Sequence, residues 1–212
     1  MFKNILFYII LTFFAINCDS KSDQPQSIPK VQNVIENNET SLYLVDIVNS
    51  EIKWIGKKIT SSHEGTIRLS SGKIKMNGNH VQSAELIVDM TTIQNTDIEN
   101  EKYRKKLNGH LRNEDFFNVE KYSTSVLKIN NSQKLEDSNF RFFGELTIKG
   151  ITHPVEFDGI IEKNEDILSA NIKLIFDRTL WGIKYGSGKF FDDLGDRMIL
   201  DNIELKITIQ TL

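Results

Sequence analysis

Four histidines are the residues of this chain best suited to general acid-base chemistry or metal binding: His63, His80, His110 and His153. An imidazole changes its charge near neutral pH and is a common metal ligand. These histidines do not form the paired helical pattern of metalloproteases, and no Gly-x-Ser-x-Gly motif supplies a nucleophile. The sequence therefore predicts a protein that is not an enzyme, with no catalytic residue, no metal site and no cofactor.

A second hypothesis gives a role to His63, Asp97, His110 and Asp115, which we expect to meet beside a short helix. There they could contact the polar head group of a ligand. They could also serve an enzyme or a metal protein, which would lose its activity on single alanine changes while keeping its fold. The alternative is that both aspartates cap short helical turns and the histidines pack at strand ends, because short polar side chains are favoured as caps.

The charge and the cysteine content exclude two other classes of protein. The net charge is -3, with 26 basic residues spread among 29 acidic ones, so no basic face for a nucleic acid is predicted. The single cysteine excludes an internal disulfide and a sulfur-rich zinc site.

The N-terminal segment is typical of a secretory signal. Lys3 precedes an apolar run from Ile5 to Ile16, and Cys18 follows this run after Asn17. This arrangement resembles the processing site of a bacterial lipoprotein, which predicts a signal peptide over 1–17 and an acylated Cys18. An uncleaved membrane anchor is the alternative, although the run is shorter than the roughly 20 apolar residues that a bilayer requires. We expect a protein on the periplasmic side of the bacterial cell envelope, anchored by lipid.

Two further regions follow the cysteine. Residues 18–41 are rich in Ser, Asn, Gln, Lys and Glu, which predicts a disordered tether. From residue 42 to 212, apolar and polar residues alternate with the period of a half-buried strand, which predicts one all-β domain with antiparallel strands. Four long strands show this most clearly: 84–90, 140–148, 168–176 and 203–209. Shorter strands are expected at 42–47, 51–58, 65–69, 73–76, 122–129 and 155–161, separated by turns such as Ser71-Gly72, Asn77-Gly78-Asn79 and Lys149-Gly150.

One segment breaks this alternation and predicts a helix from Thr96 to about Gly109. Thr96 and Glu99 have the spacing of a capping box, Glu101 and Lys105 can pair, and Tyr103, Leu107 and Leu111 form a narrow apolar stripe. A single short helix in an antiparallel barrel is expected to act as a lid over one end.

The glycine-rich stretch from Trp181 to Gly188 is predicted to form the rim of the barrel, with packing favoured over gating as the role of its aromatic residues. Phe116 and Phe117 are adjacent and follow the predicted helix. We expect one of them to enter the core and the other to line the mouth.

About eight or more such strands can close into a barrel, which either fills with its own side chains or holds one small ligand. Small residues on the inward faces favour a cavity: Ala84, Gly144, Gly159 and Ala170. Such glycines are also common where a sheet bends, because they relieve strain there. The alternative hypothesis, a scaffold protein whose barrel is filled by its own side chains, is therefore retained. The predicted lining has almost no hydrogen-bonding group, so the ligand of a cavity should be a hydrocarbon chain.

The region from Ile52 to Ile209 resembles the YceI family of lipocalin-like, polyisoprenoid-binding proteins. The resemblance rests on Trp54-Ile55-Gly56-Lys57-Lys58, on His63-Glu64-Gly65-Thr66-Ile67 and on Val88-Asp89-Met90. It rests most strongly on Thr96-Asp97 with Leu107-x-x-His110-Leu111-x-x-x-Asp115-Phe116-Phe117-x-Val119-x-x-Tyr122, and on the block from Gly144 to Phe157. Many family members have Pro where this chain has Ser123.

The resemblance implies an extended lipocalin-like β-barrel that encloses a long isoprenoid or fatty chain in a periplasmic carrier or sequestering protein. The partners are then one such lipid and, through the anchor, a membrane; monomer and homodimer both stay open. The residues that we expect to bind the ligand are Trp54, Leu86, Val88, Phe116, Phe117, Phe142, Leu146, Phe157, Ile172, Leu174, Phe176, Ile203 and Leu205.

Overall fold

The computed structural model describes residues 40–212. The signal segment, Cys18 and nearly all of the predicted tether lie outside this range. The described residues form nine strands, one α-helix and two short 3-10 helices: β1 (Thr40–Leu44), β2 (Glu51–Lys58), β3 (Ser62–Asn77), β4 (His80–Asn95), α1 (Glu101–Arg112), β5 (Thr124–Lys134), β6 (Asn139–Ile148), β7 (Ile151–Asn164), β8 (Ile167–Asp177), η1 (Arg178–Trp181), η2 (Gly195–Arg197) and β9 (Ile199–Gln210). Pairing begins at Thr40, two residues before the predicted start of the domain.

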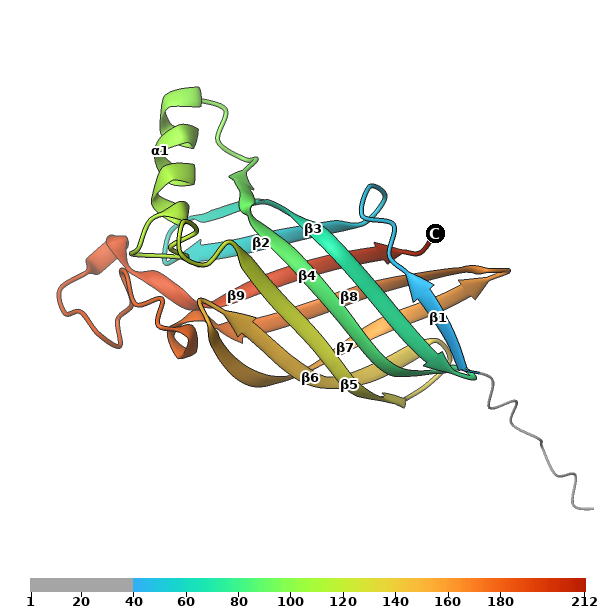
Figure 1. Cartoon of the computed structure of the whole chain (residues 1–212). Helices are drawn as coiled ribbons and strands as arrows, with labels where there is room; N and C mark the ends of the chain where they lie inside the picture. The colour runs from blue at the N-terminus through green and yellow to red at the C-terminus, as the bar shows by residue number, and fades with distance from the viewer. Residues whose placement is uncertain (1–39) are drawn as a thin grey trace, which may run out of the picture. The chain divides into compact units, whose positions relative to one another are not determined.

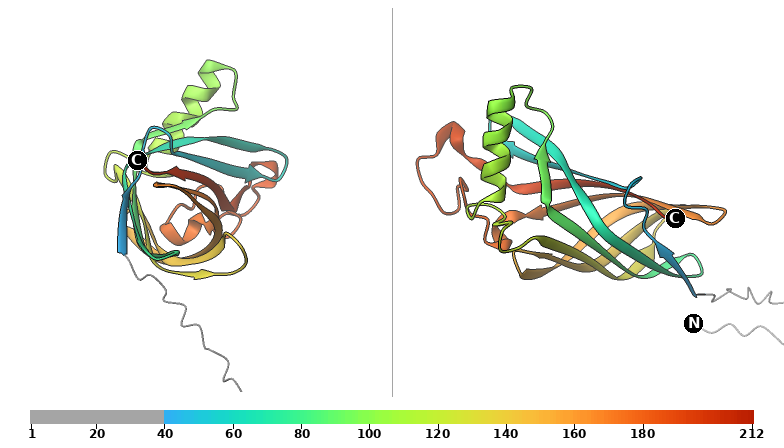
Figure 2. Two further views of the ribbon diagram at one scale, coloured as in Figure 1. Left: turned by 90° about the vertical axis from the view of Figure 1, so that its right-hand side faces the viewer. Right: turned by 45° about the horizontal axis from the view of Figure 1, so that its top comes forward.

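The strands form a closed antiparallel barrel, which confirms the predicted fold class. The pairing order runs β3, β2, β9, β8, β7, β6, β5, β4, and the pairing of β3 with β4 closes the ring. β1 pairs with residues 73–77 of β3, beyond the segment 62–67 that β2 occupies, so it extends the same edge. Figure 2 shows the ring nearly end-on in its left panel. Because β3 and β4 pair with each other, neither is left as the free edge of the sheet, and every strand has one enclosed face.

The alternation of residues along the strands is confirmed by burial. In β8, the residues Leu168, Ala170, Ile172, Leu174 and Phe176 are all buried, and the residues between them are exposed or partly exposed. The predicted hairpin turns are also present. Lys149 and Gly150 both adopt a positive φ, of 51° and 73°, as the two central residues of a tight turn between β6 and β7 require.

The predicted turn at Ser71-Gly72 is wrong, because β3 runs through it without a break. The pairing of β3 with β4 shifts register between Leu69 and Ser71, which marks a β-bulge. A bulge bends a strand and increases its twist without ending it. Gly72 faces Val45, and a Cβ atom there would come within 2.6 Å of the Val45 side chain. The residues that predicted a turn therefore serve the curvature of one long strand.

The predicted helix is present, but its ends differ from the prediction. Asn100 caps α1 by accepting hydrogen bonds from the N–H groups of Lys102 and Tyr103. The expected capping box is absent, because the Thr96 N–H donates to the Glu64 carbonyl instead. The helix also continues through Gly109 to Arg112, because a helix tolerates an interior glycine at a cost of about 1 kcal/mol. The predicted pair of Glu101 and Lys105 forms, at 2.7 Å.

α1 stands at one end of the barrel, beside the segment between β8 and β9, while β1 and the C-terminus lie toward the other end (Figure 1). Of the predicted apolar stripe, Leu111 is buried and Leu107 is half-buried, whereas Tyr103 is 63% exposed. No helix within residues 40–212 is both long enough and apolar enough to cross a membrane.

The end of the barrel away from α1 is filled by its own side chains. Phe142 lies between Phe140 and Phe157, with ring centroids 6.2 and 5.4 Å away and near-parallel planes. Gly144 and Gly159 also belong to this region, and a Cβ at either position would collide with the neighbouring strand. These glycines therefore permit close packing of strands. The expectation that they leave space is wrong, whereas the alternative that they relieve strain in a curved sheet stays a prediction.

Candidate ligand-binding cavity

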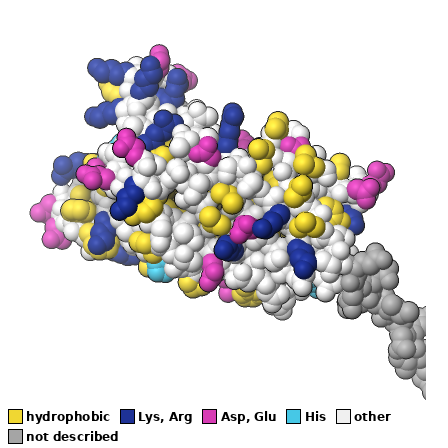
Figure 3. All heavy atoms as spheres, viewed as in Figure 1, with side chains coloured by type: hydrophobic (Ala, Val, Ile, Leu, Met, Phe, Trp, Pro, Cys, Tyr) yellow, Lys and Arg dark blue, Asp and Glu magenta, His cyan; other side chains and the backbone are white. Residues whose placement is uncertain are grey.

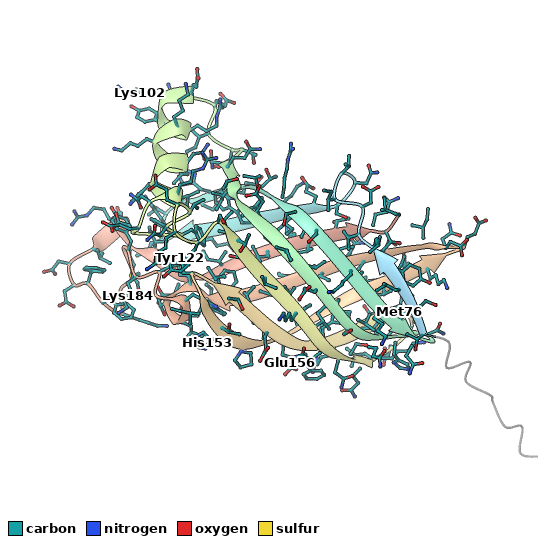
Figure 4. All side chains as sticks on the ribbon, in the orientation of Figure 1. Met76, Lys102, Tyr122, His153, Glu156 and Lys184 are labelled. Carbon is teal, nitrogen blue, oxygen red and sulfur yellow. The ribbon has the colours of Figure 1, made fainter. Side chains whose placement is uncertain are left out.

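A cavity of about 550 Å³ occupies the half of the barrel next to α1. In Figure 4, Lys102 marks α1 at this end of the barrel and Met76 marks the filled end. The wall is built mainly from inward residues of the strands and closed by residues of α1 and its following loop. Its apolar members are Ile52, Trp54, Ile67, Leu86, Val88, Met90, Ile93, Ile98, Leu107, Leu111, Phe116, Phe117, Val126, Leu127, Leu146, Ile148, Leu174, Phe176, Ile183, Ile199, Ile203, Leu205 and Ile207.

The same strand supplies residues to both halves of the barrel. In β8, Leu168 and Ala170 belong to the filled half, and Leu174 and Phe176 line the cavity. A row of inward residues at a spacing of two therefore passes from a packed core into a cavity wall without any change in pattern.

Ten of the thirteen predicted ligand-binding residues line the cavity: Trp54, Leu86, Val88, Phe116, Phe117, Leu146, Leu174, Phe176, Ile203 and Leu205. The other three, Phe142, Phe157 and Ile172, are buried but do not line it. They face inward as predicted, but they lie too far along their strands toward the filled end. Alternation identifies the face of a strand and not the height along the barrel.

The sequence places one of the two phenylalanines after α1 in the core and the other at the mouth. Phe116 is buried, Phe117 is half-buried, and both line the cavity. The Phe116 ring lies 4.8 Å from the His110 ring and 5.5 Å from Tyr185. Tyr185, which sequence reasoning did not assign to the wall, joins the loop after α1 to the segment between β8 and β9.

The rim segment after β8 is anchored by packing. The Trp181 indole N–H donates to the Leu146 carbonyl at 3.0 Å, and Trp181 and Ile183 are each 1% exposed. The packing role that we favoured for these aromatic residues is therefore present for Trp181.

Arg178, which no sequence motif indicated, organises this rim from inside the protein. Its guanidinium donates to the carbonyls of Ile183 at 2.8 Å and Ile199 at 3.1 Å, and it lies 3.5 Å from Asp201. Burial lowers the pKa of Arg178, and the nearby Asp201 opposes that effect. The side chain thus ties the segment between β8 and β9 to the start of β9.

The four residues of the head-group hypothesis form two separate pairs. His63 Nδ1 lies 3.0 Å from Asp97 Oδ2, and His110 Nε2 lies 3.2 Å from Asp115 Oδ2. Both histidines line the cavity and neither aspartate does. Within residues 40–212, no group of three or more His, Cys, Asp or Glu side chains is placed to hold a metal ion. Neither aspartate caps a helix there, which removes the capping alternative.

The Asp97 carboxylate accepts three hydrogen bonds, two from side chains and one from the backbone. Burial alone would raise the pKa of Asp97, but hydrogen bonds from His63, from Asn95 and from the Glu64 N–H hold that pKa below its ordinary value. The carboxylate therefore stays charged and orients the His63 ring at the edge of the cavity. His153 and His80 pack elsewhere: His153 Nε2 lies 3.0 Å from the Leu180 carbonyl oxygen, and His80 lies edge-on to Phe140.

Two buried polar atoms belong to wall residues and have no hydrogen-bond partner within the described chain. They are Trp54 Nε1 and Ser125 Oγ, on side chains from residues only 8% and 5% exposed. A buried polar group without a partner costs about 1 to 3 kcal/mol. Sequence reasoning placed Trp54 in the wall as an apolar contact and missed Ser125.

A closed antiparallel barrel with one apolar cavity at its end defines the class of small ligand-binding barrels. Within that class, residues 43–211 match the model of the YceI-like domain, and the chain belongs to this family. No match was found among curated protein sequences.

Solved structures show the same fold at low sequence identity. The crystal structure of BcnA from Burkholderia cenocepacia has a TM-score of 0.64 at 19% identity, covering 79% of this chain and 99% of that one. A polyisoprenoid binding domain from Saccharophagus degradans, implicated in plant cell wall breakdown, has a TM-score of 0.58 at 14% identity, covering 80% of this chain and 97% of that one.

Proposed function

We propose that this protein binds a long apolar chain, a polyisoprenoid or a related lipid, in the hollow half of its barrel. The observation that carries the proposal is the cavity of about 550 Å³ with a mainly hydrocarbon wall. Sites for single small ligands have volumes of about 300 to 1,000 Å³ and similar linings. The Saccharophagus domain with the same fold is described as polyisoprenoid-binding, which supports this class of ligand.

Apolar contact is sufficient for useful affinity in such a site. A large ligand gains about 0.3 kcal/mol for each heavy atom in contact with the protein, so about 30 buried carbons give about 9 kcal/mol. That free energy corresponds to a dissociation constant below about 1 μM. The protein would then act as a carrier or sequestering protein, and its wall residues would contribute contact alone.

The proposed place of action is the periplasmic side of a bacterial envelope, with acylated Cys18 as the anchor. The apolar run that ends at Ile16, two residues before this cysteine, supports the proposal. Metabolic labelling with a radioactive fatty acid tests it. The full chain should take up label and sediment with membranes, and Cys18→Ala should do neither; unlabelled wild-type protein would overturn the proposal.

The binding function is tested by purifying the full chain from a bacterial host and identifying its cargo by native mass spectrometry and organic extraction. One isoprenoid or acyl chain for each barrel is expected. Gly56 is suited to a blocking variant, because it lines the cavity and a Cβ there would meet only Ile203, at 3.6 Å. Gly56→Leu should fold and lose the cargo.

Gly109→Leu makes the same substitution on α1, in open space, and provides the matched control. It should retain the cargo. Folded, lipid-free wild-type protein that also takes up no added long-chain lipid would overturn the binding function.

Because His63 and His110 line the cavity, the alternative function is an enzyme that acts on the bound lipid. This alternative predicts a different result from that of a carrier. If His63 or His110 catalysed a reaction on the bound lipid, then His63→Ala and His110→Ala would accumulate an unconverted form of it. A carrier predicts that the lipid extracted from both variants is chemically identical to that from the wild type.

A further inference from the structure

The charged residues that line the cavity are all basic. Lys57, Lys58, Lys106 and Arg178 belong to the wall, and within residues 40–212 no Asp or Glu side chain does. Arg178 is occupied by the rim carbonyls and Asp201. His63 and His110 each have an aspartate partner. Among the charged side chains of the wall, those without a carboxylate partner are therefore Lys57, Lys58 and Lys106.

These three lysines have no carboxylate within ion-pair distance among the described residues. Other lysines of the barrel are paired, such as Lys73 with Glu85 at 3.0 Å and Lys173 with Glu204 at 3.5 Å. An unpaired lysine on an open surface needs no explanation. Three that share the wall of one apolar cavity leave positive charge where a ligand would enter.

The register of β2 explains how a lysine reaches the cavity. The inward row of this strand runs Ile52, Trp54, Gly56 and then Lys58, with Lys58 partly buried at the end next to α1. The pairing of β2 with β9 is irregular between Gly56 and Lys58, and this brings Lys57 to the wall as well. Lys106 approaches from α1 beside Leu107. Two separate elements thus carry cations to one opening.

We propose that the ligand of this cavity is an anionic amphiphile, with its hydrocarbon chain in the barrel and a phosphate or carboxylate head group held at the mouth by Lys57, Lys58 and Lys106. This inference rests on the proposed lipid-binding function and adds the chemical class of the head group. An ammonium group provides three donors to an oxyanion, and a hydrogen bond between charged groups is stronger than one between neutral groups.

An anionic membrane surface is the other partner that such a cluster could attract, since Lys and Arg side chains also gather on α1 (Figure 3). The position of the lysines argues against it. Lys57, Lys58 and Lys106 line the cavity, and Lys58 is partly buried at the end of the inward row of β2. A flat anionic surface would not reach a partly buried side chain in the cavity wall, whereas a single head group in the mouth would.

Two probes with one chain and different head groups test the proposal: geranylgeranyl phosphate and geranylgeraniol. The full chain is stripped of lipid and titrated with each probe by isothermal calorimetry. The wild type should bind the phosphate at least about tenfold more tightly, because one charged hydrogen bond contributes about 1.5 kcal/mol or more. Added salt should weaken the binding of the phosphate and leave that of the alcohol unchanged.

The variant Lys58→Gln/Lys106→Gln should lose that preference and keep its affinity for the alcohol. The matched control is Lys75→Gln/Lys134→Gln, which removes two exposed and unpaired lysines from the filled end. This control has the same net charge as the test variant and should bind both probes like the wild type.

Each other outcome has a distinct meaning. Equal binding of both probes by wild type and variant overturns the head-group proposal and leaves the lipid-binding function standing. Binding of neither probe overturns the function itself. If inorganic phosphate alone binds with the same dependence on Lys58 and Lys106, the mouth is a site for a free anion. If the lysine changes instead abolish binding to anionic phosphatidylglycerol vesicles and leave the preference intact, the cluster is a membrane-docking surface.

Discussion

The two halves of the barrel are built from the same strands, yet one is solid and the other is hollow. In the filled half, Phe140, Phe142 and Phe157 stack, and Gly144 and Gly159 allow neighbouring strands to approach closely. In the half next to α1, the same inward rows surround a cavity of about 550 Å³. Packing at the filled end supplies cohesion, so the other end can leave apolar surface uncovered for a ligand.

The comparison shows how a stable protein keeps an unfilled interior. Empty apolar space costs stability because the atoms around it lack contacts on one side. A rigid rim limits collapse here, since Arg178 and Trp181 tie the segment between β8 and β9 to the barrel wall. Truncating a side chain should therefore have different effects in the two halves.

The largest effect is expected from truncation in the filled half. Phe142→Ala removes a ring that is 1% exposed and should lower the free energy of unfolding by about 3 to 5 kcal/mol. Ile203→Ala, at the partly buried cavity wall, should cost only about 1 to 2 kcal/mol, because it enlarges a cavity that already exists. Urea denaturation of lipid-free protein measures both values. Equal losses would contradict the division into two halves.

Adding a methyl group, instead of removing a side chain, should also affect stability differently in the two halves. Gly144→Ala places a Cβ against the Lys128 carbonyl and should cost about 1 to 3 kcal/mol through strain. Gly56→Ala places it at an ordinary contact distance of 3.6 Å from Ile203 and should change stability by less than about 0.5 kcal/mol. Thermal denaturation of the two variants measures both changes in stability. An unchanged stability of Gly144→Ala would show that β5 and β6 can move apart.

A smaller and opposite effect is expected from the buried polar atoms of the wall. Ser125→Ala removes a hydroxyl without a hydrogen-bond partner in the described chain. The lipid-free protein should keep its stability or gain up to about 1 kcal/mol, because the desolvation cost of the group disappears. Ser132→Ala is the control, since its hydroxyl donates to the Val81 carbonyl at 3.0 Å in the filled half. That variant should be destabilised.

The smallest effect is expected in the dependence of stability on pH. The pKa of Asp97 in the folded protein lies below its ordinary value, so its charged form stabilises the fold above the unfolded-state pKa. That contribution is lost as the pH falls through the folded-state pKa. Asp97→Asn should therefore reduce stability more at pH 6 than at pH 3, measured by urea denaturation at both values. A difference that grows toward low pH would contradict this assignment.

The sequence predicted most of the local structure of this protein. Alternation at a spacing of two identified the inward face of the four strands in which it is clearest, 84–90, 140–148, 168–176 and 203–209, because side chains of a strand must alternate. The turns at Asn77-Gly78-Asn79 and Lys149-Gly150 followed from their residue types, and Gly78 and Gly150 adopt a positive φ there. The predicted turn at Ser71-Gly72 was wrong, because the same residue types mark a bulge there. The predicted capping box at Thr96 was also wrong, because the Thr96 N–H donates to the Glu64 carbonyl on β3.

What the sequence alone determined was therefore the class of fold, the face of each strand and the apolar character of the interior. Only the tertiary structure decided which inward residues meet a neighbour and which meet empty space. Phe142 and Phe176 are alike in their local pattern, but one is stacked between rings and the other lines the cavity. The physical reason is that filling depends on how strands far apart in the sequence approach one another. For the same reason, the sequence did not reveal that Arg178 binds carbonyl groups of the rim or that Lys57, Lys58 and Lys106 share one cavity wall. Closure of the barrel brings these groups together.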